Sequence, residues 1–201
     1  MVTALDLPSQ ILLDSETLKR WTVEEYHRLS KLGLLDSNER TELIAGQITV
    51  MAAKGVPHVT ALRFLAIQLD NFLHNKPFFV STQDPIRLSD LSEPEPDLVI
   101  AQGDASAYID HHPEPKEICL VVEVADTTLK KDCEIKDKLY AKSNISEYWV
   151  VDLKHRSLHI FRQPTAQGYS SHLILSETNE ISPEAFPELS LDIASMLPPK
   201  S

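Results

Sequence analysis

One stretch decides the expected fold: residues 118–124, with the sequence ICLVVEV. Its apolar side chains do not alternate with polar ones, so we expect a central strand that is buried on both faces of a sheet. Glu123 interrupts the apolar run near its end. A carboxylate in such a strand is costly unless it is paired, hydrogen-bonded or bound to a cation, so Glu123 is a candidate functional residue.

The segments that follow this strand predict a helix and further strands. Residues 128–142 have helical spacing, with apolar side chains available for an inner side. Residues 147–152, 157–161 and 169–175 are typical of strands, and residues 154–156 form a turn between the first two. Tyr148 and Trp149 lie inside an apolar strand, so we expect them to pack in the core.

The segments that precede it predict two helices, a hairpin and short strands. Thr22 caps the first helix and Gly33 closes it, while Pro57 begins the second. The predicted helices cover residues 22–33 and 57–73. The predicted strands cover residues 42–44 and 47–51, which form a hairpin around Ala45 and Gly46, and residues 78–82, 85–88 and 97–101. This order predicts an α/β or α+β fold with a mixed sheet flanked by helices.

Length and composition favour one folded domain. The chain has 201 residues, 42% of them hydrophobic and 24% charged, so we expect an N-terminal extension over residues 1–20 and a single domain over residues 21–197. No apolar stretch approaches the roughly 20 residues that span a bilayer. The N-terminus lacks the pattern of a signal peptide, and we therefore expect no membrane segment and a cytoplasmic location.

Charge and cysteine content narrow the function classes. The formal net charge of −11 argues against a general nucleic-acid coat protein, because phosphate contacts require Lys and Arg. A nuclease stays open, because a bound metal ion can reverse the local field. Cys119 and Cys133 have no metal-finger spacing, so we expect two reduced thiols.

Asp97 is the second carboxylate at the end of a predicted buried strand. The sequence EPEP at residues 93–96 is a rigid entry to that strand, and two neighbouring strands could bring Asp97 and Glu123 to one cleft. Such a pair suits Mg²⁺ together with waters and phosphate oxygens. The alternatives are a turn residue after proline for Asp97 and a salt bridge to a helix lysine for Glu123.

Asp132, Lys136 and Tyr140 are spaced four residues apart, which places them on one face of the helix after the Glu123 strand. A lysine near a metal-bound phosphate can stabilise transition-state charge. The alternatives are an exposed ion pair between Asp132 and Lys136, and core packing for Tyr140. The lysines of this helix could face phosphates or remain solvated; they are Lys130, Lys131, Lys136, Lys138 and Lys142.

Several motifs in order resemble a known family, the Uma-type restriction endonucleases of cyanobacteria, within the PD-(D/E)XK nuclease superfamily. The resemblance extends over about residues 20–195. The motifs are ELIAG at residues 42–46, His58, EPD at 95–97, VEV at 122–124, Asp132, Lys136, Tyr140 and EYWVVD at 147–152.

The resemblance implies a restriction-endonuclease-like core, phosphodiester hydrolysis with Mg²⁺ or Mn²⁺, and Asp97 and Glu123 as metal ligands. We expect the Val124 carbonyl to complete the ligand set and DNA to be the substrate. The superfamily lysine normally lies two residues after the glutamate, where this chain has Ala125. Lys136 is the expected substitute, because a side chain from the following helix can reach back toward the strand end.

Glu42 and His58 are further candidates: Glu42 as an additional carboxylate and His58 as a residue that orients a ligand or water. The alternatives are a surface position on an edge strand for Glu42 and a polar position at a helix start for His58. Two rival functions stay open. One is a nuclease fold without catalysis that binds nucleic acid or a protein, and the other is a homodimeric interaction protein.

Overall fold

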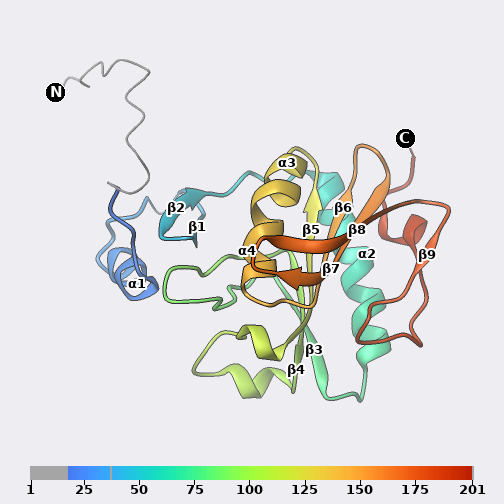
Figure 1. The fold of residues 1–201 in the computed structure, drawn as a ribbon, viewed down its shortest axis with the longest axis horizontal. Coiled ribbons are helices and arrows are strands. Elements are labelled where there is room, and N and C mark those ends of the chain that lie inside the picture. Colours follow the sequence, from blue (N-terminus) through green and yellow to red (C-terminus); the bar gives the residue numbers. More distant parts are fainter. Residues whose placement is uncertain (1–17, 37, 201) are drawn as a thin grey trace.

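A six-stranded mixed sheet forms the centre of the computed structural model, which describes residues 18–36 and 38–200 (Figure 1). Most of the expected N-terminal extension, residues 1–17, lies outside the described residues. The strand order is β3-β4-β5-β6-β7-β8. Their bounds are β3 Phe78–Thr82, β4 Leu98–Gln102, β5 Ile118–Ala125, β6 Glu147–Asp152, β7 Ser157–Thr165 and β8 Gly168–Ser176.

Strand β5 is the central strand that its apolar sequence predicts. All eight of its residues are buried, and it pairs antiparallel with β4 and parallel with β6. A parallel pair requires a crossover, which here is a helical run made of α3 (Leu129–Lys131), a π-helical turn η3 (Asp132–Lys136) and α4 (Asp137–Lys142). The helix predicted over residues 128–142 is therefore confirmed in extent, with a π turn in its middle.

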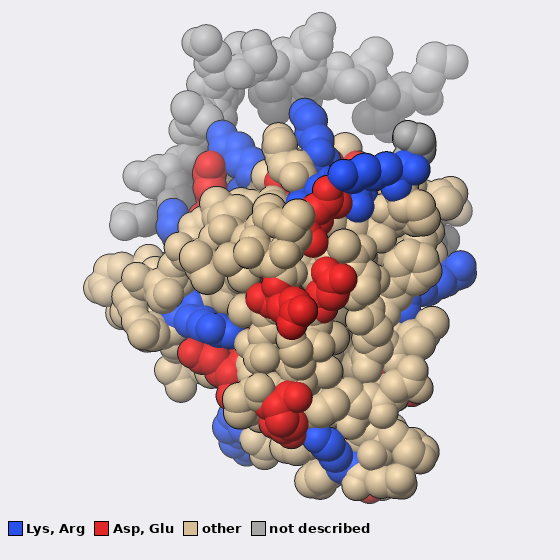
Figure 2. All heavy atoms as spheres, turned by 90° about the vertical axis from the view of Figure 1, so that its right-hand side faces the viewer, with Lys and Arg blue, Asp and Glu red and all other residues tan. Residues whose placement is uncertain are grey.

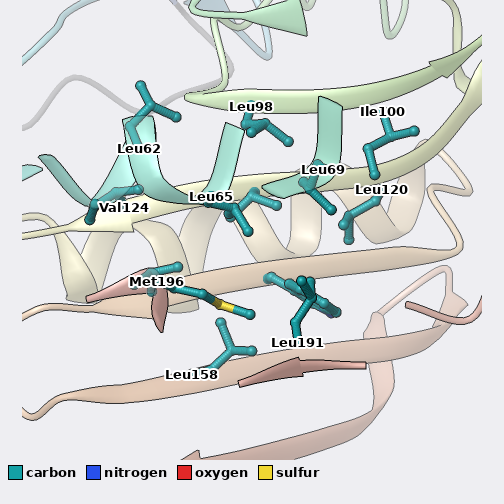
Figure 3. Packing of buried hydrophobic residues seen from close by; sticks show 14 of the residues in the cluster. Leu62, Leu65, Leu69, Leu98, Ile100, Leu120, Val124, Leu158, Leu191 and Met196 are labelled. Atoms are coloured by element: carbon teal, nitrogen blue, oxygen red, sulfur yellow. The ribbon is translucent and has the colours of Figure 1, made fainter. Parts of the chain in front are cut away.

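Two hydrophobic clusters cover the two faces of the sheet. On one face, α2 (Val56–Leu73) packs Leu65 and Leu69 against β4 and β5 side chains such as Leu98 and Leu120 (Figure 3). On the other face, the helical run packs Tyr140 against β5 and β6. Tyr148 and Trp149 are fully buried, which confirms their predicted core positions.

The N-terminal part adds a helix and a separate two-stranded sheet. Helix α1 (Val23–Lys31) begins with a capping box between Thr22 and Glu25. The predicted hairpin is confirmed as β1 (Thr41–Ile44) and β2 (Gln47–Val50), and its turn residues Ala45 and Gly46 have φ of 50° and 81°. Positive φ at both turn positions is typical of the tight hairpin turn that matches strand twist.

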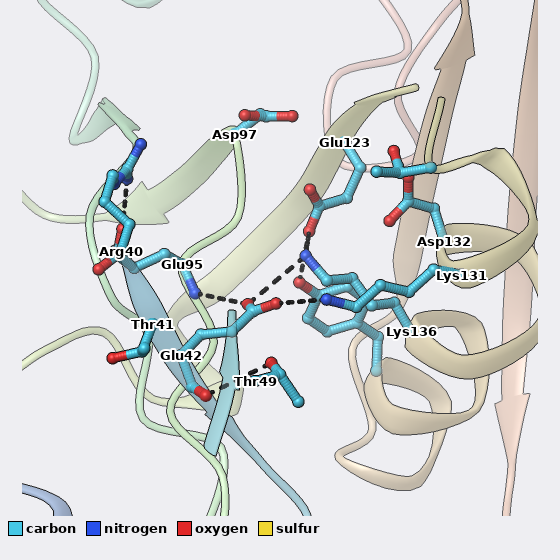
Figure 4. Close-up of polar contacts among 12 residues, drawn as sticks. Arg40, Thr41, Glu42, Thr49, Glu95, Asp97, Glu123, Lys131, Asp132 and Lys136 are labelled. Atoms are coloured by element: carbon cyan, nitrogen blue, oxygen red, sulfur yellow. Dashed lines mark hydrogen bonds and ion pairs between the residues drawn. The ribbon is translucent and has the colours of Figure 1, made fainter. Parts of the chain in front are cut away.

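The hairpin is joined to the chain before β4. The backbone N–H of Glu93 donates to the Leu43 carbonyl at 2.8 Å, and the N–H of Leu43 returns a bond of 3.3 Å. This pairing brings Glu42 to the same end of the sheet as Asp97, as the close-up in Figure 4 illustrates.

One predicted strand is wrong. Residues 85–88 form no strand, because Pro85 lacks an N–H and the next three N–H groups donate to separate segments, with that of Arg87 bonded to the Pro113 carbonyl at 2.9 Å. Ile86 donates to the Pro94 carbonyl and Leu88 to the Ser92 carbonyl, both at 3.0 Å. Shorter elements complete the fold: η1 (Ala105–Tyr108), η2 (Pro115–Glu117), β9 (Glu180–Ile181), β10 (Leu191–Asp192) and η4 (Ile193–Met196).

Two further expectations concern membranes and charge. Within the part of the chain that the structure describes, no helix is long and apolar enough to cross a membrane.

Figure 2 shows acidic side chains near the centre of the face on the right of Figure 1, and basic side chains toward its rim. Because side chains of both charges lie on this face, its charge does not favour the binding of a phosphate backbone.

Candidate active site

Asp97 and Glu123 meet at one end of β4 and β5. Leu98 pairs with Val122, so Asp97, the residue before β4, lies beside Glu123. Each of the two residues is only 5% exposed. Both line a cavity of about 60 Å³, and the other polar side chains in its wall include Lys54, His58, Asp132 and Lys136. The predicted cleft between two neighbouring strands is therefore present.

Asp97 is held in place through one carboxylate oxygen. Its Oδ2 accepts hydrogen bonds from the ring nitrogen Nε2 of His58 and from the backbone N–H of Val124, both at 2.9 Å. Its Oδ1 lies 3.2 Å from Nζ of Lys54. Burial acts to raise the pKa of Asp97, but the His58 and Val124 hydrogen bonds hold it below the ordinary value. Asp97 is thus an oriented, ionised carboxylate.

Glu123 has one occupied oxygen and one without a partner. Oε1 accepts a hydrogen bond from Lys136 Nζ at 2.7 Å (Figure 4). It also accepts one from the Tyr140 hydroxyl at 2.9 Å. Among the described residues, none donates to Oε2. Burial raises the pKa of Glu123 against the opposing charge of Lys136, and the negative charge of Asp97 adds to the rise. A cation at this carboxylate would stabilise its charged form.

Glu42 belongs to the same buried network. It is 1% exposed, so its alternative as a surface residue of an edge strand is wrong. Oε1 lies 2.9 Å from Lys131 Nζ, and Oε2 lies 3.6 Å from Lys136 Nζ. The backbone N–H of Glu95 also donates to Oε2, at 3.3 Å. Burial acts to raise the pKa of Glu42, but the Lys136 and Lys131 charges hold it below the ordinary value.

Asp132 and Lys136 lie on the π turn, and the alternative of an exposed ion pair between them is wrong. They are 3% and 4% exposed, respectively. Lys136 bonds Glu123, whereas Asp132 accepts a hydrogen bond of 2.6 Å from the Thr128 hydroxyl. Burial would lower the pKa of Lys136, but the charges of Glu123 and Glu42 raise it, so Lys136 remains an ammonium group. Single π turns in helices frequently occur at functional sites.

Ala125 explains how a helix lysine reaches this carboxylate. Ala125 and Glu123 lie two residues apart on β5, so their side chains point to the same face of the sheet, which the helical run covers. Ala125 is fully buried and adds only a methyl group to that space. The expected reach of Lys136 to the strand end is therefore present in the structure.

Tyr140 combines its predicted core packing with a polar contact. Its ring is fully buried and its centroid lies 4.8 Å from that of Tyr148, while its hydroxyl bonds Glu123.

Cys119 and Cys133 form no disulfide, as expected.

Lys54 and Asp126 are charged cavity residues that the sequence did not identify as candidates. Lys54 lies in the segment between β2 and α2, and its side chain is 16% exposed. The local sequence AAKG at residues 52–55 matches no motif, and a single lysine before a helix gives no signal. Only the fold brings it to Asp97.

The residues at this site fit a hard divalent cation. Among residues 18–36 and 38–200, no three His, Cys, Asp or Glu side chains form a ready metal-binding group. Asp97 and Glu123 instead offer two carboxylates and leave the remaining positions to other oxygen donors, as Mg²⁺ prefers. A water needs only roughly 10–15 Å³ of such space, so a cavity of about 60 Å³ admits an ion together with other oxygen ligands.

Comparisons with known proteins identify the family and support the fold. A protein-family model, Uma2, with the description "Putative restriction endonuclease", matches residues 23–194. A solved structure from Anabaena variabilis, described as a "putative nuclease belonging to DUF820", superposes with a TM-score of 0.67 at 14% identity. The superposition covers 87% of this chain and 96% of that one, and therefore supports the fold. Among curated proteins, none matches the sequence significantly.

Proposed function

This chain belongs to the Uma2 family, whose description is "Putative restriction endonuclease". We propose that it is a divalent-metal-dependent endonuclease that hydrolyses phosphodiester bonds in DNA. One observation carries the proposal: Asp97, Glu123 and Lys136 share one small cavity, with the lysine 2.7 Å from the glutamate. Two oxygen ligands beside a fixed ammonium group suit the hydrolysis of a phosphodiester.

The proposed ligands of Mg²⁺ or Mn²⁺ are Asp97, Glu123 and the Val124 carbonyl. In an extended strand, the N–H and C=O of one residue point to the same side. The Val124 N–H points toward Asp97, so the Val124 carbonyl faces the same edge of β5. When bound, the ion supplies Lewis-acid chemistry: it polarises a phosphate oxygen and makes water a better nucleophile.

The other residues act on charge and orientation in this proposal. Lys136 stabilises the negative charge that develops on the phosphate, and Tyr140 keeps Glu123 in place through Oε1. His58 fixes the orientation of Asp97, which leaves Oδ1 toward the cavity side. Glu42 holds Lys131 and lies near Lys136, so its role is to position these two ammonium groups.

The direct test is cleavage of supercoiled plasmid and of single-stranded DNA with Mg²⁺ or Mn²⁺. We expect Asp97→Ala, Glu123→Ala and Lys136→Ala each to lose at least about a hundredfold in rate, the usual cost of one preorganised electrostatic group. Asp70→Ala is the matched control, because Asp70 is exposed on α2. Cleavage that survives Asp97→Ala would overturn the assignment.

A second candidate is a nuclease-fold binding module without catalysis. The net charge of −11 and the absence of a lysine at Ala125 favour it. Calorimetry with Mn²⁺ separates the two candidates: the nuclease requires saturable binding that Glu123→Gln removes, and the binding module requires none.

Homodimer formation is a separate proposal that is compatible with either candidate. Strand β8 is an edge of the sheet, with Leu173 and Ile174 47% and 55% exposed, and an uncovered edge can pair with a second copy. Sedimentation of the full chain tests it, and a monomer at micromolar concentration would contradict it.

A further inference from the structure

The ammonium group of Lys54 has hydrogen-bond donors that no described residue accepts. Its Nζ is buried and makes an ion pair with Asp97 Oδ1 at 3.2 Å, but it has no hydrogen-bond partner among the described residues. An ammonium group has three donors, and leaving them unmade in a buried position costs free energy. Such a group is expected where a ligand supplies the missing acceptor.

Orientation of Asp97 does not require this lysine. His58 and Val124 already hold Oδ2 of Asp97 with two hydrogen bonds of 2.9 Å each. Oδ1 is the oxygen that remains for a metal ion, and a cation there would weaken the hold of Asp97 on Lys54. Lys54 is thus placed to exchange Asp97 for another anion at the same site.

The start of helix α2 is a second feature beside Lys54 that suits an anion, in a wall that also carries carboxylates such as Asp126. Helix α2 has 18 residues, its N-cap is Gly55, and no side chain caps its first N–H groups. Gly55 and His58 from this helix start line the cavity together with Lys54. The uncapped start of a long helix carries partial positive charge and unpaired donors, a common phosphate-binding arrangement.

Three lysines line the cavity, and Lys131 is paired with Glu42 at 2.9 Å. The other two, Lys54 and Lys136, differ in their neighbours. Lys136 is bonded to Glu123 at 2.7 Å and lies near Glu42, so it has two carboxylate neighbours. Lys54 has a single carboxylate neighbour at 3.2 Å and unused donors. A phosphate that enters between them gains more from Lys54, whose donors are available.

We propose that Lys54, together with the N-terminus of α2, binds a non-bridging oxygen of a nucleic-acid backbone phosphate at the Asp97–Glu123 cavity. This inference rests on the proposed nuclease function and names the contact that holds its substrate. Lys54 then contributes to substrate affinity, while Lys136 contributes to the chemical step.

The test measures binding of the full chain to a fluorescein-labelled DNA duplex by anisotropy, with Ca²⁺ as the cation, over a range of salt concentrations. Lys54→Met removes the charge and keeps the side-chain length, and Lys54→Arg keeps the charge. Lys76→Met is the control, because Lys76 follows the far end of α2 and pairs with Glu188 at 3.0 Å. An 18-residue helix separates it from Lys54 by about 27 Å.

We expect Lys54→Met to raise the Kd about ten- to a hundredfold, as for a lost charged hydrogen bond. The slope of log K against log salt should fall by about 0.9, the value for one phosphate contact. Lys54→Arg should keep most of the affinity, and Lys76→Met all of it. The affinity for Mn²⁺, measured by electron paramagnetic resonance, should not weaken in Lys54→Met. The substitution removes the Lys54 ammonium group, which competes with the metal ion for Asp97.

The outcomes distinguish this inference from the proposed function. An unchanged Kd and salt slope in folded Lys54→Met would overturn the inference alone, and so would a loss of Mn²⁺ binding, which would make Lys54 a structural residue. Wild type that binds DNA but never cleaves it would overturn the nuclease and leave the Lys54 contact supported. Wild type that does not bind DNA would overturn both.

Discussion

The side-chain nitrogen Nζ of Lys136 lies 2.7 Å from Oε1 of Glu123. Lys136 belongs to the helical run that follows β5, the strand that carries Glu123. Lys136→Met keeps the length of the side chain and removes its charge. We expect at least about a hundredfold loss of cleavage rate. We also expect about 3–5 kcal/mol lower free energy of unfolding, since the substitution leaves the buried Glu123 carboxylate without its ion-pair partner.

Plasmid cleavage and urea unfolding measure the two effects of Lys136→Met. Lys142→Met, at the exposed end of α4, is the control and should leave both unchanged. Wild-type cleavage by Lys136→Met would show that the lysine serves the fold alone.

Tyr140→Phe tests the second donor to Glu123. The aromatic ring should keep its packing against Tyr148, while Glu123 loses one of two hydrogen bonds to Oε1. We expect about 1.5–3 kcal/mol lower free energy of unfolding, the range for hydrogen bonds to charged groups, and a smaller loss of cleavage than in Lys136→Met.

Tyr169→Phe is the matched control for Tyr140→Phe. The Tyr169 hydroxyl donates to the Ile145 carbonyl at 2.9 Å, a neutral acceptor. It should cost about 0.5–1.5 kcal/mol and leave cleavage unchanged. Equal effects of the two substitutions on cleavage would contradict a role for Tyr140 at Glu123.

Metal binding should stabilise the fold through Asp97 and Glu123. A ligand at a hundredfold excess over its Kd adds about 2.7 kcal/mol to the free energy of unfolding. We expect Mn²⁺ to raise the Tm of wild type and EDTA to reverse the rise. Asp97→Asn and Glu123→Gln should abolish the Mn²⁺ effect, whereas Asp70→Asn, on the exposed side of α2, should retain it. A full Tm rise in Glu123→Gln would place the ion elsewhere.

Glu147, which lies outside the proposed metal site, makes the free energy of unfolding depend on pH. It is fully buried and accepts hydrogen bonds from Trp149 Nε1 and Arg162 Nε, both at 2.8 Å. Burial raises the pKa of Glu147 above its ordinary value of 4.5, although these hydrogen bonds oppose the rise. The folded pKa exceeds the unfolded one, so its contribution to stability is complete below about pH 4.5 and is lost as pH rises through the folded pKa.

Comparison with Glu147→Gln isolates this pH effect. The free energy of unfolding of wild type minus that of Glu147→Gln should fall as pH rises above 4.5. Glu24→Gln, an exposed position on α1, should show no such trend. A difference that grows with pH would mean that the Arg162 ion pair outweighs burial.

The sequence predicted the elements whose pattern is local. The apolar run around Glu123 marked the central strand, and the Ala45–Gly46 turn marked the hairpin, because each needs only its own residues. The pairing of Asp97 with Glu123 followed from two strands that end in carboxylates. The helical spacing of Asp132, Lys136 and Tyr140 made Lys136 a candidate, and the family resemblance supported it as the catalytic lysine.

Other features depend on contacts that are distant in the sequence. Residues 85–88 have a strand-like composition, yet their N–H groups donate to the carbonyls of Ser92, Pro94 and Pro113 and not to one neighbouring strand. The π turn that carries Asp132 and Lys136 has no pattern in the sequence, and burial of Glu42 requires pairing of β1 with Glu93. Lys54 became a site residue only because the segment after β2 folds against Asp97.

Moving the lysine back onto the strand gives the sharpest test of its substitution. Ala125 and Glu123 share one face of β5, so Ala125→Lys directs a second ammonium group into the space that Lys136 fills. We expect the single variant Ala125→Lys to be less stable, by about 1–3 kcal/mol from overpacking, and to gain no activity. In the double variant Ala125→Lys/Lys136→Met, the strand lysine gains both the space and the carboxylate partner.

We expect the double variant to cleave plasmid faster than Lys136→Met alone, and to regain part of its free energy of unfolding, because one buried ammonium again pairs Glu123. Ala125→Met/Lys136→Met supplies similar bulk without charge and is the control. If both double variants cleave no faster than Lys136→Met, the position of Lys136 on the helix is required, and strand and helix lysines are not interchangeable in this fold.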